Sequence, residues 1–117
     1  SAYEEVSTIA TGKLKAEALY YDAYFKNQSG NYEASTAVIQ DLTKNYARFK
    51  DFGVKGLLLM AKNFYALGDS YNATYILENI IKNFDAYPKT ISKAEILLKE
   101  IKAKASETNS SVDVNQN

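Results

Sequence analysis

The chain has 117 residues, of which 46% are hydrophobic and 24% charged, with 14 basic and 14 acidic side chains. This mix is typical of one soluble globular domain, and a net charge of zero argues against nucleic-acid binding, which needs an excess of positive charge. Because Cys and His are absent, thiol nucleophiles, Cys/His zinc sites and Ser-His-Asp triads are excluded. No apolar run approaches the roughly 20 residues of a membrane span, so no membrane insertion is expected.

An internal repeat organises the chain. Sliding the sequence on itself by about 38 positions superimposes Leu19 on Leu57, Ala23 on Ala61, Gly30 on Gly68, Thr36 on Thr74, and Lys44-Asn45 on Lys82-Asn83. Identities and apolar matches recur in one register without gaps, which chance would scatter. The sequence therefore predicts two copies of one structural unit.

Each copy is predicted to form two helices. The first helix runs from Leu14 to Gln28, and residues at helical spacing (Leu14, Ala18, Tyr21, Phe25) form its apolar face. Gly30 suits the left-handed conformation that often follows a helix end. A second helix follows, from Tyr32 to Tyr46. The segment before Leu14 is ambiguous: it is either a short helix or the end of a preceding repeat.

The second copy repeats this plan. Residues 50–53 are predicted as the break between copies, 54–67 as the third helix, 68–69 as a turn, and 71–84 as the fourth helix. The apolar stripe of the third helix is expected to be core. Leu58 and Leu59 are the exception, because the repeat register places them toward the groove side and one of them is expected to be exposed.

A fifth helix is predicted from Ile91 to Ala105, after Pro88. Ser92 and Glu95 have the spacing of a capping box. Its apolar stripe comprises Ala94, Leu97, Leu98 and Ile101, and its outward residues comprise Lys93, Lys99, Glu100, Lys102 and Lys104. A repeat stack needs a terminal helix with a polar outer face, so this helix is predicted to be a cap.

Together these features predict an all-α fold, a right-handed α-α superhelix of two helix hairpins and a C-terminal capping helix. The predicted segments are an N-terminal segment 1–12, repeat one 13–50, repeat two 51–88, the capping helix 89–105 and a disordered tail 106–117. The tail is predicted to be disordered because it offers almost no apolar side chains to bury.

The repeating residues resemble the tetratricopeptide motif. The motif's small residue in the first helix corresponds to Ala23 and Ala61, its turn to Gly30-Asn31-Tyr32 and Gly68-Asp69-Ser70, and its second-helix positions to Ser35 and Ala73, then Ile39 and Leu77. The second turn departs from the motif by having Ser70 where Tyr is typical. The first copy lacks the proline that usually ends the motif. This resemblance implies a scaffold with no catalytic residues and no cofactor.

The stretches KAEALYYDAYFKNQSGNYEAS and MAKNFYALGDSYNATYILENII further resemble the C-terminal end of large multi-repeat tetratricopeptide proteins of bacteroidetes. The likeness covers about Gly12 to Lys104. Such proteins are often placed in the cell envelope, so the resemblance favours periplasm or envelope, while cytoplasm stays open because no disulfide constrains the compartment.

In that family the first helix of each repeat lines a concave groove. Carried over, the resemblance puts these residues on the groove: Tyr20, Tyr24, Asn27, Gln28, Lys55, Lys62 and Tyr65. Tyr offers contact area with a hydrogen-bonding tip, and Asn or Lys binds peptide backbone and carboxylates. The pattern does not reproduce the clamp with which chaperone-binding members hold a C-terminal carboxylate, so that ligand is not predicted. The alternative is that Tyr20 and Tyr24 pack against a preceding repeat.

Two functions follow. The first is a non-catalytic scaffold that binds a protein or peptide partner through the groove. The alternative is a structural C-terminal cap of a longer repeat array, or a self-association module that forms a homo-oligomer, with no groove ligand. Enzymatic activity and metal binding are not expected, because the carboxylates, such as Glu17 and Asp22, fall on different helix faces.

Overall fold

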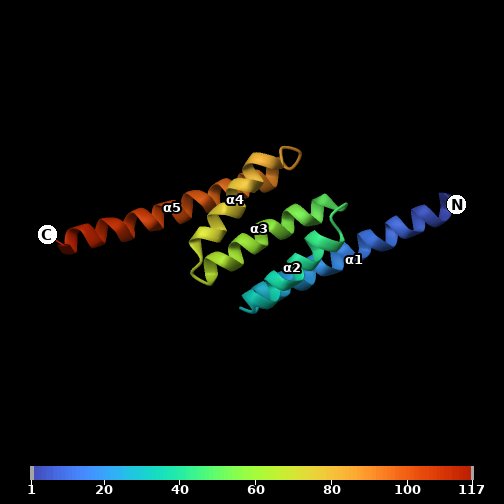
Figure 1. The fold of residues 1–117 in the computed structure, drawn as a ribbon, viewed down its shortest axis with the longest axis horizontal. Coiled ribbons are helices and arrows are strands. Elements are labelled where there is room, and N and C mark those ends of the chain that lie inside the picture. The colour runs from blue at the N-terminus through green and yellow to red at the C-terminus, as the bar shows by residue number, and fades with distance from the viewer. Residues whose placement is uncertain (1, 117) are drawn as a thin grey trace.

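The computed structural model describes the backbone of residues 2–116, and the side chains of these residues except 3 and 108–116. The described chain is all-helical (Figure 1). Its helices are α1 (Ala2–Gln28), α2 (Tyr32–Asn45), α3 (Lys50–Ala66), α4 (Ser70–Asn83) and α5 (Pro88–Gln116). Because α1 and α5 project in opposite directions, the molecule is elongated, with extents of 73 × 29 × 18 Å.

Glycine ends the first helix of each hairpin, as predicted. Gly30 and Gly68 have φ angles of 82° and 84°, a left-handed conformation that costs glycine little because it lacks a Cβ. After each glycine the next backbone N–H reaches back to the preceding helix, from Asn31 to the Lys26 carbonyl and from Asp69 to the Phe64 carbonyl, both at 2.8 Å. This bond from the sixth residue to the first is the Schellman motif, which reverses the chain and starts the next helix.

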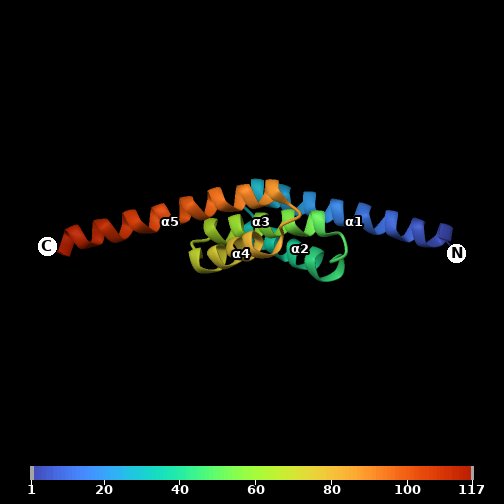
Figure 2. The same ribbon diagram turned by 90° about the horizontal axis from the view of Figure 1, so that it is seen from above.

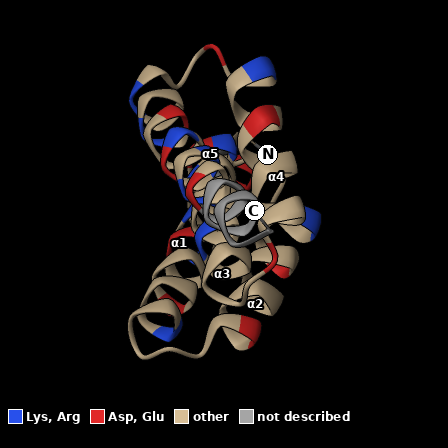
Figure 3. Cartoon of the chain, turned by 90° about the vertical axis from the view of Figure 1, so that its left-hand side faces the viewer, with Lys and Arg blue, Asp and Glu red and all other residues tan. Residues whose placement is uncertain are grey.

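The helices form two layers. Figure 2 shows α1, α3 and α5 on one side of the molecule and α2 and α4 on the other. Each helix packs against its neighbours in sequence, and α3 also packs against α1 and α5 in its own layer. Viewed along the long axis, basic and acidic residues are spread over both layers (Figure 3).

The core lies between the layers and is largest around α3, α4 and α5. Its fully buried side chains include Val54, Ala61, Leu77 and Ile80, each at most 1% exposed. A smaller cluster, formed by Ala23, Ile39 and Leu59, joins α1, α2 and α3. Burial of this apolar surface, at about 25 cal/mol per Å², is the main favourable term that holds the hairpins together.

Equivalent positions of the two predicted copies have equivalent burial. The small residues of the first helices and the small and large residues of the second helices are all fully buried: Ala23 with Ala61, Ser35 with Ala73, Ile39 with Leu77, and Leu42 with Ile80. Small residues at such positions let two helix backbones approach closely. The repeat seen in the sequence is therefore also a repeat of packing.

The predicted apolar face of the first helix is wrong. Leu14, Tyr21 and Phe25 are exposed, as is Ala18, while α1 packs on α2 through a different side that includes Ala16 and Ala23. Helical spacing identifies a stripe without saying which stripe faces the core, and here the small residues face it because α2 approaches closely.

The first and third helices begin earlier than predicted. α1 starts at Ala2, so the ambiguous residues 2–12 form its first turns. α3 starts at Lys50, and the expected break at residues 50–53 is its first turn, where the Gly53 N–H donates to the Phe49 carbonyl at 3.1 Å. The chain instead reverses at residues 46–49, where the Phe49 N–H donates to the Tyr46 carbonyl.

The last helix also differs from its prediction. α5 begins at Pro88, whose missing N–H and fixed φ suit the first position of a helix. Ser92 and Glu95 therefore lie inside α5 and do not cap it. The predicted apolar stripe is confirmed: Ala94 and Ile101 are buried, and Leu97 and Leu98 are half-buried against the core.

At its other end α5 continues to Gln116, across the segment predicted as a disordered tail. Residues 102–107 of this extension are exposed, so the helix's own hydrogen bonds rather than packing hold that part. The outward lysines and Glu100 of the predicted polar face are all exposed.

Candidate functional site

A groove runs across the layer formed by α1, α3 and α5, and it encloses about 520 Å³. Its lining residues are Tyr20, Tyr21, Tyr24, Asn27 and Gln28 of α1, Lys55, Leu58, Leu59 and Lys62 of α3, and Lys89, Thr90 and Lys93 of α5. Neighbouring helices of this layer are separated in the sequence by one helix of the other layer: α2 lies between α1 and α3, and α4 lies between α3 and α5.

The structure brings six of the seven predicted site residues together in this groove. The exception is Tyr65, which is half-buried against the core of α3, α4 and α5 and does not line the groove. Leu58 and Leu59 both line the groove floor, but they are only 7% and 5% exposed, so the expectation that one of them is exposed is wrong.

Positive charge dominates the groove. Four of its lining residues are lysines, and none of its lining residues, all in the described part of the chain, is Asp or Glu. Lys55 lies 3.7 Å from the Asp51 carboxylate and 5.8 Å from the centre of the Phe52 ring. Among the described residues the structure records no ion pair for Lys62, Lys89 or Lys93. These three ammonium groups are available to an anionic partner.

The tyrosines form the wall opposite the lysines of α5. The rings of Tyr20 and Tyr21 meet edge to face at 5.3 Å between centroids, and Tyr24 meets Phe25 in the same way at 5.5 Å. Burial raises the pKa of the Tyr20 phenol above its ordinary value, and the neighbouring phenols of Tyr21 and Tyr24 raise it further. A tyrosine is protonated at neutral pH even at its ordinary pKa near 10, so the Tyr20 hydroxyl is a hydrogen-bond donor in the lining of the groove.

A buried network of amides and hydroxyls fixes the end of the groove near Asn27. The Asn27 amide donates to Asn63 Oδ1 at 2.7 Å, and Asn63 Nδ2 donates to Ser35 Oγ at 2.8 Å and to Thr36 Oγ1 at 3.2 Å. Gln28 in turn donates to Asn27 Oδ1 at 3.1 Å. Because Asn63 is fully buried, this network holds α1, α2 and α3 in one arrangement and orients Asn27.

Lys89, Thr90 and Lys93 are groove residues that the sequence reasoning missed. The 38-residue register carries the signal, since Ala18, Gly56 and Ala94 are spaced by 38 residues each. α5 is thus equivalent to α1 and α3, and its groove-facing side adds two lysines. The fifth helix had been interpreted only as a cap, so its contribution to the groove was not expected.

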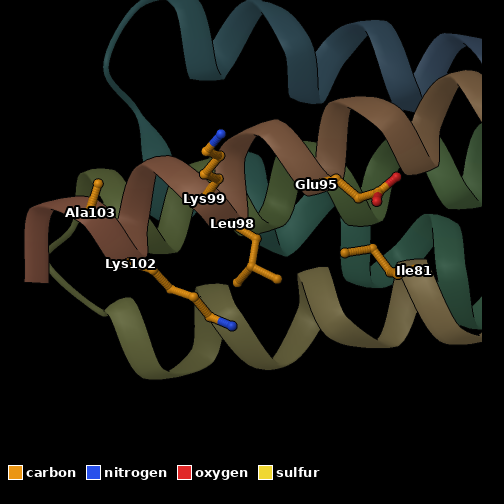
Figure 4. A pocket seen from close by; sticks show the side chains of 6 residues that line it. All are labelled: Ile81, Glu95, Leu98, Lys99, Lys102 and Ala103. Atoms are coloured by element: carbon orange, nitrogen blue, oxygen red, sulfur yellow. The ribbon is translucent and has the colours of Figure 1, made fainter. Parts of the chain in front are cut away.

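A second hollow lies between α4 and α5 and encloses about 650 Å³ (Figure 4). Its floor is apolar, with Leu98 of α5 and Ile81 of α4 on opposite sides. Glu95, Lys99 and Lys102 border it on α5. Both signs of charge lie at this rim, so it lacks the one-sided charge of the first groove.

The described residues contain no group of three or more Asp, Glu, His or Cys side chains placed to share a metal ion. No described helix is both long and apolar enough to cross a bilayer. Comparisons of the chain with protein-family models, with curated proteins and with solved structures found no match.

Proposed function

We propose that this chain is a non-catalytic scaffold that binds an acidic, extended segment of a partner protein in the groove across α1, α3 and α5. The observation that carries this proposal is the lining of the groove: four lysines, three tyrosines and no carboxylate. Complementary charge steers an acidic partner to the groove and disfavours basic partners. Tyrosine supplies contact area at low entropic cost.

The proposed architecture is a right-handed α-α superhelix of the tetratricopeptide type. Three features support it: the two layers of alternating helices, the glycine-terminated first helix of each hairpin, and the small buried residues Ala23 and Ala61. In such a stack the first helices of successive hairpins share one face. An extended peptide crossing that face meets side chains from every hairpin.

Selection from a random 12-residue peptide display library tests the proposal. We expect the protein to enrich peptides rich in Asp and Glu, and binding of the enriched peptides to weaken as salt rises, because exposed charges are screened. The double variant Lys62→Glu, Lys93→Glu should weaken their binding about tenfold or more, which corresponds to about 1.4 kcal/mol. Tyr24→Ala should weaken binding while the melting curve changes little, because Tyr24 is 37% exposed.

The matched control reverses two lysines of the other layer. Lys44 of α2 and Lys82 of α4 are exposed, so Lys44→Glu, Lys82→Glu changes the net charge equally without touching the groove. The proposal is refuted if the two double variants lose the same affinity, or if the library yields no acidic enrichment. Large destabilisation by Tyr24→Ala would instead show that this ring is part of the core.

A further inference from the structure

An exposed apolar stripe runs along α1, and one of its members, Tyr21, also borders the groove. Leu14, Tyr21 and Phe25 are 67%, 48% and 64% exposed, and Ala18 is exposed between them. Their spacing of four, three and four residues places them in one row along the helix. A row of large apolar side chains in water is a candidate interaction surface.

The same row is covered by a helix on α3. Adding 38 to each position gives Phe52, Gly56, Leu59 and Asn63. The preceding hairpin covers this face: Tyr20 of α1 lies against Phe52, and α2 packs on Gly56 and Asn63. A Cβ on Gly56 would lie 3.2 Å from both Ile39 and Leu42, and Asn63 donates to Ser35 of α2. α2 thus approaches α3 closely enough to exclude even a methyl group without adjustment.

The row is covered again on α5. Adding another 38 gives Thr90, Ala94, Leu97 and Ile101. Thr90, Ala94 and Ile101 are at most 8% exposed, and Leu97 is half-buried. The helix that covers Ala94 and Ile101 is α4, whose Ala73, Leu77 and Ile80 belong to the same core cluster, whereas Thr90 borders the groove.

We propose that the stripe formed by Leu14, Ala18, Tyr21 and Phe25 docks an amphipathic helix of a partner protein, running antiparallel to α1. The two internal interfaces specify its pattern. α2 presents Ser35, Ile39 and Leu42, and α4 presents Ala73, Leu77 and Ile80, so the partner helix carries a small residue followed by large aliphatic residues four and seven positions later.

The apolar version of this pattern fits best. On α3 the fourth position of the row is Asn63, which is matched by the hydroxyls of Ser35 and Thr36. On α1 the equivalent residue is Phe25, which is apolar like Ile101 of α5. The partner helix therefore resembles α4, with Ala rather than Ser at its small position. A second copy does not supply it, because these faces of α2 and α4 are already buried.

A peptide of residues 69–86, which contains α4, is the probe. Added to the intact, isotopically labelled protein at up to about millimolar concentration, it should shift the NMR resonances of Leu14 and Phe25, which lie outside the groove lining, saturably. High concentration is needed because an isolated helix of this length is marginal in water. Phe25→Lys and Leu14→Lys should each weaken this binding about tenfold or more, with the circular dichroism spectrum unchanged since both side chains are exposed.

Tyr75→Lys is the matched control. Tyr75 is 67% exposed on α4, close to the 64% of Phe25, but it lies outside the stripe, so this variant should bind the peptide as the wild type does. The proposal is overturned if the peptide shifts no resonance of the stripe, or if Tyr75→Lys and Phe25→Lys have equal effects. Sedimentation velocity completes the test. If the wild type is a dimer and Phe25→Lys dissociates it, a second copy of the chain covers the stripe, and the proposal of a partner helix is overturned.

Discussion

The buried amide of Asn63 gives a sharp test of how the first hairpin is held to α3. Asn63 is fully buried and makes hydrogen bonds with Ser35, Thr36 and Asn27. The equivalent position on α5 is Ile101, which belongs to the same core cluster as Ala73, the counterpart of Ser35. The interface between α2 and α3 is therefore polar at this position, and the equivalent interface between α4 and α5 is apolar. The test converts the polar interface into the apolar one by substitution.

Asn63→Ile alone should destabilise the fold by about 2–4 kcal/mol. It removes three hydrogen bonds, each contributing about 1 kcal/mol net, and leaves the Thr36 hydroxyl without the partner that the structure records for it. Adding Ser35→Ala removes a second polar group and recreates the Ala–Ile pair of the other interface. Replacing both partners of a hydrogen bond by apolar groups is nearly neutral. Thr36 and Asn27 still lack Asn63 in the double variant, and the Ser35 bond to the Ala23 carbonyl is lost, so the double variant should recover only part of the lost stability.

Urea denaturation followed by circular dichroism at the helix band measures these free energies. Thermal melting should show the single variant about 10 °C below the wild type. A double-mutant cycle then gives the coupling between positions 35 and 63, expected at about 1 kcal/mol or more. An Asn63→Ile variant as stable as the wild type, or single effects that simply add, would refute the network's role in holding α3 to the hairpin.

Three further predictions concern the helices and their turns. Ala61→Leu should destabilise by about 1–3 kcal/mol through overpacking, because Ala61 is fully buried; a neutral effect would contradict the close helix packing. Gly68→Ala should lower the stability of the fold by about 1 kcal/mol, because Gly68 has a φ of 84°. Gly53→Ala should raise the stability by up to about 1 kcal/mol, because Gly53 lies inside α3 with open space at its Cβ. Equal effects of the two substitutions would contradict the turn geometry. Hydrogen bonds from Asn72 lower the pKa of Asp69, the N-cap of α4. The ionised Asp69 carboxylate therefore stabilises the fold fully above its ordinary pKa near 4, and this contribution is lost as the pH falls through the lowered pKa. Melting temperatures below pH 4 should therefore fall for the wild type relative to Asp69→Asn, and parallel curves would exclude this contribution.

Much of the local structure could be predicted from the sequence. Gly30 and Gly68 marked the hairpin turns because only glycine adopts their conformation at low cost. The end of α1 at Gln28 and the starts of α2 and α4 were predicted to within one residue. The early start of α3 was missed because residues 50–53, including Gly53, were interpreted as a break, although they lie inside the helix and continue its hydrogen bonding. The start of α1 was left ambiguous in the sequence.

The groove was predicted in part. Resemblance selected six residues of α1 and α3 that do lie together. Lys89 and Lys93 were missed because α5 was considered as a cap alone, although its 38-residue spacing from α3 was present in the sequence. Tyr65 was misplaced because, one turn beyond Lys62, its side chain packs toward the core of α4 and α5.

The sequence by itself determined the repeat, the hairpin turns and which positions of the second helices are small or large. These properties depend on neighbouring residues or recur at a fixed spacing, so they can be predicted from the sequence alone. Only the tertiary structure decided which stripe of α1 faces inward. Leu14, Tyr21 and Phe25 form as regular an apolar row as any in the chain, yet they are exposed. Their counterparts on α3 and α5 are buried or half-buried because α1 and α2 cover those on α3 and α4 covers most of those on α5. Such coverage depends on which helices are neighbours, which periodicity along one helix does not encode.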